Sequence, residues 1–219
     1  MTLNAMALRE GKKITQTRLH MFDELLFLPN LTCRPSLRTR GDEAKSVIVS
    51  ELKQTLDKRV WASVIGGKLS AMQRATTIRS SMFLKQKNNP DGSFHKLKGR
   101  LVAGGNQQDK SLCEDSSSPT VSTSTVFTLL AVAAYEERRV AVIDISGAYL
   151  NADMPLEVPV HMRLDCTMTD LILDIDPKYS KYTDARGGVT VHLEEALYGC
   201  VKSSGLWYEN MYATMLGLG

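Results

Sequence analysis

The sequence predicts an α+β fold, because helical and strand patterns follow one another without the strict alternation of an α/β chain. Three observations carry this prediction. Apolar residues recur at helical spacing in several segments, two strongly alternating segments flank a turn-rich stretch, and short apolar runs typical of strands occur in the second half. The chain of 219 residues is 43% hydrophobic and 23% charged, which is ordinary for a globular protein.

Composition narrows the classes of protein. The formal net charge of +3 is too small to indicate a partner. The four cysteines form no C-x-x-C pair, which argues against a zinc ribbon or a disulfide framework and predicts reduced thiols; they are Cys33, Cys113, Cys166 and Cys200. No apolar run approaches the roughly 20 residues that cross a bilayer, and the N-terminal residues do not resemble a signal peptide. We therefore expect an intracellular, cytoplasmic protein without a targeting signal or a membrane partner.

The first part of the chain is predicted to be an arm followed by a helix. Residues 1–42 combine basic, polar and proline-containing pieces with one apolar patch, Leu25–Leu28, and are predicted to form a poorly ordered arm or linker. Residues 43–64 are predicted to form a helix. Its apolar stripe has a period of about 3.6 residues and comprises Ala44, Val47, Ile48, Leu52 and Leu56. Trp61 is expected to anchor this helix to the body of the protein.

A β-hairpin is the strongest local signal. Ser80–Lys87 and Phe94–Ala103 alternate apolar and polar residues and flank the turn-rich stretch NNPDGS. One face of the hairpin is therefore apolar and the other cationic. The apolar face comprises Met82, Leu84, Leu97 and Leu101, and the cationic face comprises Lys85, Lys87, Lys96, Lys98 and Arg100.

The cationic face has two interpretations. Like charges opposite each other on a sheet are unfavourable, so a face of cations without interleaved carboxylates reduces local stability. It is either a solvated edge, on which lysines prevent aggregation, or a surface that binds a polyanion such as a nucleic-acid backbone or a nucleotide triphosphate. Charge alone does not separate these two interpretations.

The second half of the chain is predicted to contain a buried helix, a central strand and further short elements. Thr125–Arg138 is nearly apolar all round, with Ser122 or Ser124 as its N-cap, so we expect a buried helix. The apolar run Val140–Ile143 is typical of a buried central strand, which ends at Asp144. The remaining predictions are strands at Glu157–Arg163 and Val189–Leu193, a variable polar insert from Asp165 to about Gly188, and an amphipathic helix at Leu206–Leu218.

Asp144 is the focal residue for chemistry. A carboxylate at the end of a buried strand, followed by the small residues Gly147 and Ala148, suits a metal site that opens to a cleft. Hard cations such as Mg²⁺ take oxygen ligands, often one or two carboxylates together with substrate phosphates. The alternative interpretation is that Asp144 caps the short helix that begins near Ser146.

Four blocks of sequence extend this argument beyond a single aspartate. They are IRSSMFLKQKNNPDGSFHKLKGRLVAGGNQQD at 78–109, SSPTVSTSTVFTLLAVAA at 117–134, VIDISGAYLNADM at 142–154 and LEEALYGCVKSSGLWYENM at 193–211. Their order and approximate spacing resemble the reverse transcriptase domain of Ty1/copia-type retrotransposons. One block alone could arise by chance, whereas four in series are specific.

The resemblance implies the fingers and palm of a reverse-transcriptase-like polymerase over residues 43–219, with fingers at about 43–120 and a partial palm at about 121–219. The basic hairpin would lie over the template and the incoming nucleotide. Asp144 would be the first catalytic, metal-binding aspartate, with Mg²⁺ or Mn²⁺ as cofactor. Ala148 and Tyr149 would line the nucleotide site, with the Tyr149 ring beneath the sugar, where it would exclude a 2′-hydroxyl; core packing is the alternative for Tyr149.

Two further residues and the partners follow from the same resemblance. Tyr198 and Gly199 would flank the nucleotide pocket. The partners would be an RNA or DNA template-primer and a deoxynucleoside triphosphate. The sequence does not indicate an oligomeric state.

The sequence departs from the family at the second metal motif. The other metal-binding carboxylates of such enzymes lie in a later Asp-Asp hairpin, and this chain contains no adjacent Asp-Asp pair. We therefore expect a domain truncated before the second catalytic hairpin. By descent it would perform template-directed nucleotidyl transfer with two metal ions, but it would be inactive as this chain. The alternative function is a non-catalytic remnant that binds nucleic acid through the basic hairpin.

Overall fold

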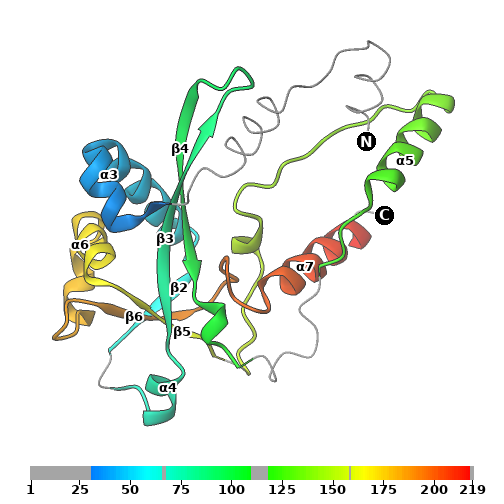
Figure 1. Cartoon of the computed structure of the whole chain (residues 1–219). Helices are drawn as coiled ribbons and strands as arrows, with labels where there is room; N and C mark the ends of the chain where they lie inside the picture. The colour runs from blue at the N-terminus through cyan, green and yellow to red at the C-terminus, as the bar shows by residue number, and fades with distance from the viewer. Residues whose placement is uncertain (1–30, 66–67, 110–117, 158, 218–219) are drawn as a thin grey trace.

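The computed structural model describes residues 31–65, 68–109, 118–157 and 159–217, which form a mixed α/β arrangement around one six-stranded sheet (Figure 1). Five strands follow the order β1-β3-β5-β6-β2, and β4 pairs with β3 off this path. β3 and β5 are parallel, and the other pairs are antiparallel. Residues 1–30 of the predicted arm lie outside the described residues.

The described elements follow the labels of Figure 1. The strands are β1 (Leu31–Thr32), β2 (Trp61–Val64), β3 (Ile78–Asn88), β4 (Phe94–Ala103), β5 (His161–Leu164) and β6 (Val189–Leu193). The α-helices are α3 (Cys33–Asp57), α4 (Ala71–Ala75), α5 (Thr123–Tyr135), α6 (Cys166–Ile175) and α7 (Ser203–Gly217). Short 3₁₀ helices are η2 (Gly105–Gln107), η4 (Ala148–Asn151) and η5 (Pro177–Tyr182). None of the described helices is long and apolar enough to cross a membrane.

α3 supplies the layer that covers the apolar face of the hairpin. Its side chains Ile48 and Leu52 are fully buried and lie in one core with Leu84 of β3 and Leu101 of β4. α6 lies beside α3 on the same side of the sheet (Figure 1). The described core therefore lies between two helices and the sheet, and it contacts the hairpin on its apolar face.

α3 begins earlier and ends earlier than predicted. Residues 31–42, which were predicted to belong to the arm, form β1 and the first part of α3, and Gly41 then interrupts the helix with φ 46° and ψ −120°. The predicted apolar stripe starts directly after this break. The helix ends at Asp57, so the prediction that it continues to Val64 is wrong. Trp61 lies instead on β2, where it is buried and donates from its indole Nε1 to the Tyr179 hydroxyl, 3.1 Å away.

The predicted hairpin is confirmed. β3 and β4 pair antiparallel from Ser80 opposite Ala103 to Asn88 opposite Phe94. Buried and exposed residues alternate along both strands, as the sequence pattern indicates. The strand at Val189–Leu193 is also confirmed, with the predicted bounds.

The predicted polar insert is partly a helix. α6 occupies its first part, with Asp165 as the N-cap and Met168, Leu171 and Ile172 buried. These apolar residues recur at helical spacing. The sequence predicted only a variable polar insert from Asp165 to about Gly188 and did not identify the short amphipathic pattern that forms α6 within it.

The predictions of a buried helix and a buried central strand after residue 120 are wrong for the described structure. Ser122 does cap α5, accepting from the Thr125 N–H at 3.2 Å, but no residue of α5 is buried. Val140–Ile143 forms no strand, and Val142 is 95% exposed. In Figure 1, α5 stands away from the sheet. The physical reason is that apolar runs become buried only where a second layer covers them and a neighbouring strand accepts their hydrogen bonds.

A histidine pair on the sheet predicts a pH-dependent stability. His161 of β5 is buried opposite His192 of β6, with ring centroids 5.3 Å apart. Burial lowers the pKa of His161, and His192 lowers it further. The unfolded chain therefore takes up a proton at higher pH than the folded protein does. It follows that the unfolding free energy falls as the pH drops below about 6.5, the pKa of an unfolded histidine.

We expect urea denaturation between about pH 7.5 and pH 5.5 to show this loss, with a slope below about 1.4 kcal/mol per pH unit, the limit for one proton. His161→Gln should flatten the slope, because the titrating group is removed. His95→Gln, which changes an exposed histidine of β4, is the control and should leave it unchanged. A slope in His161→Gln equal to that of the wild-type protein would contradict the assignment.

Candidate functional site

The five predicted cations lie on one exposed face of the hairpin. The register places Lys85 opposite Lys98 and Lys87 opposite Lys96, so like charges face each other across the two strands. Arg100 follows on the same face, opposite Phe83. All five side chains are exposed, and none forms an ion pair with any described residue. The structure therefore leaves these five cations without a salt-bridge partner among the residues that it describes.

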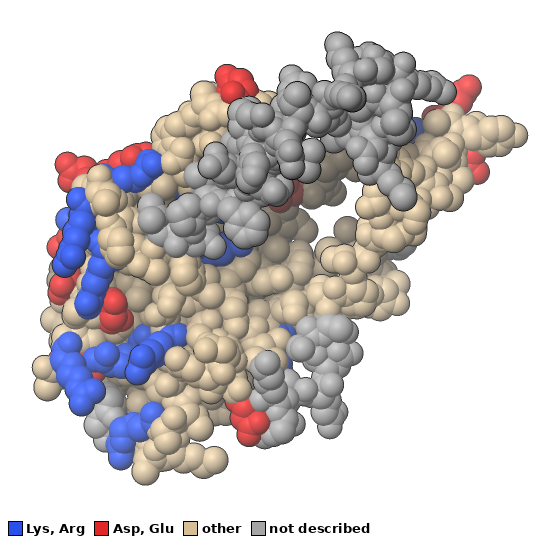
Figure 2. All heavy atoms as spheres, in the orientation of Figure 1, with Lys and Arg blue, Asp and Glu red and all other residues tan. Residues whose placement is uncertain are grey.

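Lys and Arg also gather on the side of the molecule that carries α3 and α6 (Figure 2). Several cations in this region have carboxylate partners. The Arg34 guanidinium of α3 lies 3.9 Å from an Asp165 carboxylate oxygen, and Lys45 Nζ of α3 lies 3.1 Å from an Asp174 carboxylate oxygen of α6. The hairpin differs because its charges are not matched in this way, so it is the better candidate for an anion surface.

At the Arg100 end of the cationic face, the hairpin contacts a pair of tyrosines. The guanidinium carbon of Arg100 lies 4.4 Å from the ring centroid of Tyr198, a cation–π contact. The Tyr198 ring lies 4.8 Å from the Tyr149 ring, at an interplanar angle of 42°. Burial raises the pKa of Tyr198, Arg100 lowers it, and Asp144 is near enough to raise it. The structure thus brings Arg100, Tyr149 and Tyr198 together from separate parts of the chain, and Asp144 lies near enough to act electrostatically on Tyr198.

A close backbone contact fixes this meeting point. The Ala103 N–H at the end of β4 donates to the Tyr198 carbonyl oxygen at 2.7 Å. Gly199 has φ 90°, and a Cβ there would overlap the Ala103 carbonyl oxygen and the Val102 side chain. A Cβ on Gly105 would overlap the Gly199 carbonyl oxygen. Only glycine allows two backbone segments to approach this closely, so Gly199 permits the contact between this segment and the end of β4. The role of Gly199 in a nucleotide pocket stays a prediction.

The segment that carries Ala148 and Tyr149 is a short 3₁₀ turn. Gly147, the N-cap directly before η4, lies in the left-handed region with φ 61°, which favours glycine. Leu150 is buried and attaches the turn to the core, while Ala148 and Tyr149 are half-buried. Tyr149 therefore contacts the core and also contributes to the surface beside Tyr198.

Three polar side chains hold this turn, and the sequence analysis did not identify them. The Asn151 amide donates to the carbonyl oxygens of Gly147 and Ala148, each at 3.1 Å. Lys58, directly after α3, donates to Asn151 Oδ1, and Asn210 of α7 donates to the Asn151 carbonyl oxygen at 3.0 Å. A polar residue that bonds across the fold has no periodic signal, so only the tertiary structure reveals it.

Asp144 is exposed and lies outside the sheet. The N-cap position of η4 is Gly147, without a side-chain capping bond, so the structure does not show the capping role considered for Asp144. Nowhere among the described residues do three His, Cys, Asp or Glu side chains form a group that could hold a metal ion. Asp144 would thus supply one ligand, and the described residues do not fit a complete site for Mg²⁺ or Mn²⁺.

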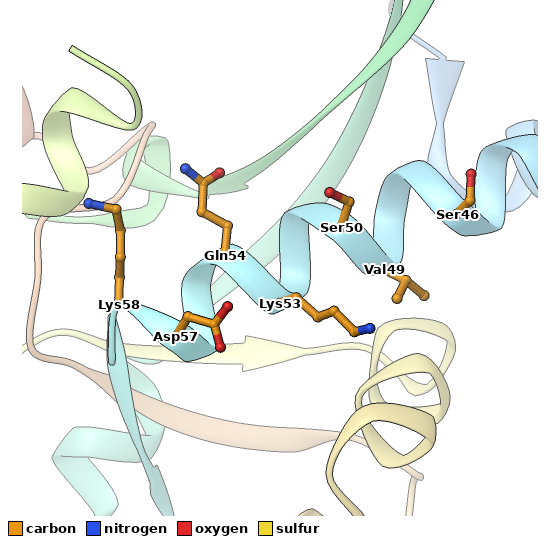
Figure 3. Close-up of a pocket in the computed structure, with 7 residues that line it drawn as sticks. All are labelled: Ser46, Val49, Ser50, Lys53, Gln54, Asp57 and Lys58. Atoms are coloured by element: carbon orange, nitrogen blue, oxygen red, sulfur yellow. The ribbon is translucent and has the colours of Figure 1, made fainter.

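A hollow of about 620 Å³ lies along α3 (Figure 3). Its lining recurs at helical spacing and comprises Ser46, Val49, Ser50, Lys53, Gln54, Asp57 and Lys58. At one end, Lys58 reaches the turn through Asn151, and the Gln54 amide nitrogen would lie 3.0 Å from a Cβ on Gly147. The hollow adjoins the turn but contains none of the predicted site residues.

The described residues thus form a mixed α/β arrangement in which a cationic hairpin ends beside two tyrosines. Residues 68–219 match the family model described as reverse transcriptase (RNA-dependent DNA polymerase), and the chain belongs to this family. Enzymes of this family generally bind a nucleic-acid template and deoxynucleoside triphosphates and use Mg²⁺. No curated protein and no solved structure matches the chain.

The close backbone contact at Gly199 predicts that one added methyl group there will strongly reduce the stability of the fold. We expect Gly199→Ala to reduce the unfolding free energy by more than about 2 kcal/mol, because it combines an unfavourable positive φ with an overlap against β4. Gly92→Ala is the matched control, because Gly92 has φ 87° but nothing within 4 Å of a Cβ. Chemical denaturation of both variants separates the two contributions, and equal losses would show that the close contact is unimportant.

Proposed function

We propose that this chain is the nucleic-acid-facing and nucleotide-facing part of a Ty1/copia-type retrotransposon reverse transcriptase, and that it does not polymerise by itself. Membership of the reverse transcriptase family supports the reaction class, template-directed nucleotidyl transfer by an RNA-directed DNA polymerase. The finer Ty1/copia assignment rests on the four sequence blocks. The division into fingers at about 43–120 and a partial palm at about 121–219 is part of the same proposal.

The observation that carries the proposal is the continuity between the cationic face and the tyrosine pair. Lys85, Lys87, Lys96 and Lys98 line the open part of the face, and Arg100 connects it to Tyr198. Like-charge pairs without counter-charges are unfavourable until an anion neutralises them. This supports a polyanion ligand over a merely solvated edge.

The tyrosine pair supports a nucleotide at the base of this face. Tyr149 and Tyr198 are both half-buried, so each has an accessible part; Tyr198 lies beside the cation Arg100, and Tyr149 lies beside Tyr198. A triphosphate near Arg100 would place its sugar close to the Tyr149 ring. In this proposal Tyr149 excludes a 2′-hydroxyl by its bulk, Ala148 leaves space because its side chain is small, and Gly199 positions Tyr198.

A non-catalytic function is the second candidate, and one observation favours it. Asp144 is a single accessible carboxylate, and no described group of side chains completes a metal site with it. A remnant that holds nucleic acid through the hairpin needs only the cationic face. The two candidates share the binding surface and differ in whether Asp144 has a catalytic role.

The hairpin proposal predicts a salt-dependent affinity. We expect the purified chain to bind a labelled single-stranded oligonucleotide, and Lys98→Glu together with Arg100→Glu to weaken that binding at least about tenfold at low salt. Each phosphate contact that is lost should reduce the slope of log affinity against log salt by about 0.7. Fluorescence anisotropy at several salt concentrations measures both quantities.

The control makes the same change of charge elsewhere. Lys178→Glu together with Arg186→Glu reverses two exposed cations on or after η5, outside the hairpin. This double variant should change the affinity less than about threefold, because surface charges at a distance are screened by salt. Equal losses in the two double variants would mean that the net charge, and not the hairpin face, determines binding.

We also expect no primer extension by the 219-residue chain with Mg²⁺ or Mn²⁺. One carboxylate does not hold two divalent ions against water, and Mg²⁺ gives up its water ligands reluctantly. The measurement is gel analysis of a labelled primer annealed to RNA or DNA. Robust incorporation by this chain alone would contradict the proposal that it is catalytically incomplete.

A fusion protein distinguishes the two candidate functions. Adding a family-like Asp-Asp hairpin and thumb to the chain should restore extension if the polymerase site is otherwise intact. Asp144→Asn should then abolish it, while oligonucleotide binding persists. A fusion protein that folds and binds but does not extend would favour the non-catalytic remnant.

A further inference from the structure

Glu51 of α3 lies beneath the cationic hairpin and contacts it at one point. Its Oε1 accepts a hydrogen bond from the Leu101 N–H of β4 at 3.1 Å. Gly99, two residues earlier, lies next to α3, since a Cβ there would be 3.2 Å from Val47 Cγ1 and 3.6 Å from the Glu51 Cβ. α3 thus crosses β4 closely at this position, one helical turn before and at Glu51.

The bonded N–H belongs to the outer edge of β4. Among the described residues β4 pairs with no strand other than β3, so its outward N–H groups need other partners. Two successive outward groups have them: Leu101 N–H donates to Glu51, and Ala103 N–H donates to the Tyr198 carbonyl oxygen. These two bonds fix the backbone on the C-terminal side of Arg100.

The carboxylate of Glu51 also lies within electrostatic range of the site. Burial raises the pKa of Glu51, whereas the bond from Leu101 and the charges of Arg100 and Lys98 lower it. Glu51 in turn acts on Tyr198, whose pKa it raises. The half-buried carboxylate is thus close to the cation and to the ring that form the cation–π contact.

We infer that Glu51 is a positioning residue that holds Arg100 over Tyr198 by fixing the edge of β4 at Leu101. The inference deepens the proposed function, on which it rests, because it assigns a residue that prepares the anion site without touching the ligand. Glu51 stands in none of the four sequence blocks. Its role depends on α3 crossing the hairpin.

Two substitutions at this position separate geometry from charge. Glu51→Gln removes the charge but keeps an oxygen that accepts from Leu101, and Glu51→Ala removes both. Loss of a negative charge near Arg100 and Lys98 favours the binding of an anionic ligand. The Gln variant should therefore bind a labelled single-stranded oligonucleotide as tightly as the wild-type protein or up to about fivefold more tightly. The Ala variant should bind at least about threefold more weakly than the Gln variant, because the strand edge is no longer held.

The dependence on Arg100 provides the second half of the test. In an Arg100→Ala background, the Gln and Ala variants should bind equally, since the group that Glu51 positions has been removed. Asp57→Asn, an exposed carboxylate on the same helix, is the control for charge and should behave alike in both backgrounds. Equal affinities of the Gln and Ala variants in the wild-type background, or a difference that persists without Arg100, would overturn the inference.

A measurement without ligand keeps this inference separate from the proposed function. Hydrogen exchange of the Leu101 amide, followed by NMR, should be at least about tenfold faster in Glu51→Ala than in Glu51→Gln or the wild-type protein. If the wild-type protein does not bind the oligonucleotide, the proposed function fails, and the Leu101 exchange still decides whether Glu51 holds the strand. Unchanged exchange in a folded Glu51→Ala variant would overturn the positioning role.

Discussion

The close contact between the end of β4 and the Tyr198–Gly199 backbone is the constraint on which the candidate site depends. It joins a hairpin from the first half of the chain to a segment nearly a hundred residues later through one hydrogen bond and a pair of glycines. Because a Cβ on either glycine would overlap a carbonyl oxygen, the approach requires both glycines. Arg100 lies close to this contact, which brings its guanidinium over the Tyr198 ring.

The hairpin has opposite requirements on its two faces. Its apolar face is buried against α3, where Leu84 and Leu101 are fully enclosed. Its other face carries like charges in register, which opposes strand pairing by a few tenths of a kcal/mol or more for each pair. Burial of one leucine contributes about 2 kcal/mol, so the apolar face can support a cationic face that would not form a stable hairpin alone. The lysines can therefore remain open to solvent.

The region after residue 120 shows that local sequence signals can form a helix even where no other element packs against it in the described structure. Ser122 caps α5 and the helix forms, yet Phe127 and Leu129 remain more than 60% exposed. Val140–Ile143 has the composition of a central strand but no neighbouring strand among the described residues. Consequently Asp144 lies on an exposed segment that leads into the turn at Gly147, which Asn151 and Lys58 hold.

The sequence by itself determined the elements whose signals are local. The period-two alternation predicted the hairpin and its cationic face, and the stripe after Gly41 predicted the main part of α3. The strand β6 was also predicted, with its observed bounds. The sequence also indicated the reverse transcriptase family, because four ordered blocks are specific even when each is short. Periodicity shows which side chains of a segment lie on the same face, and this grouping does not depend on what packs against that face.

Only the tertiary structure decided what those faces meet. It brought Glu51 to the edge of β4, Arg100 to Tyr198, and Lys58 and Asn210 to the turn at Asn151, and it left α5 and the segment before Asp144 exposed. These outcomes depend on contacts between residues far apart in the chain. Such contacts depend on how the layers of secondary structure pack and on how closely two backbone segments can approach. The spacing of residues within one segment therefore does not predict them.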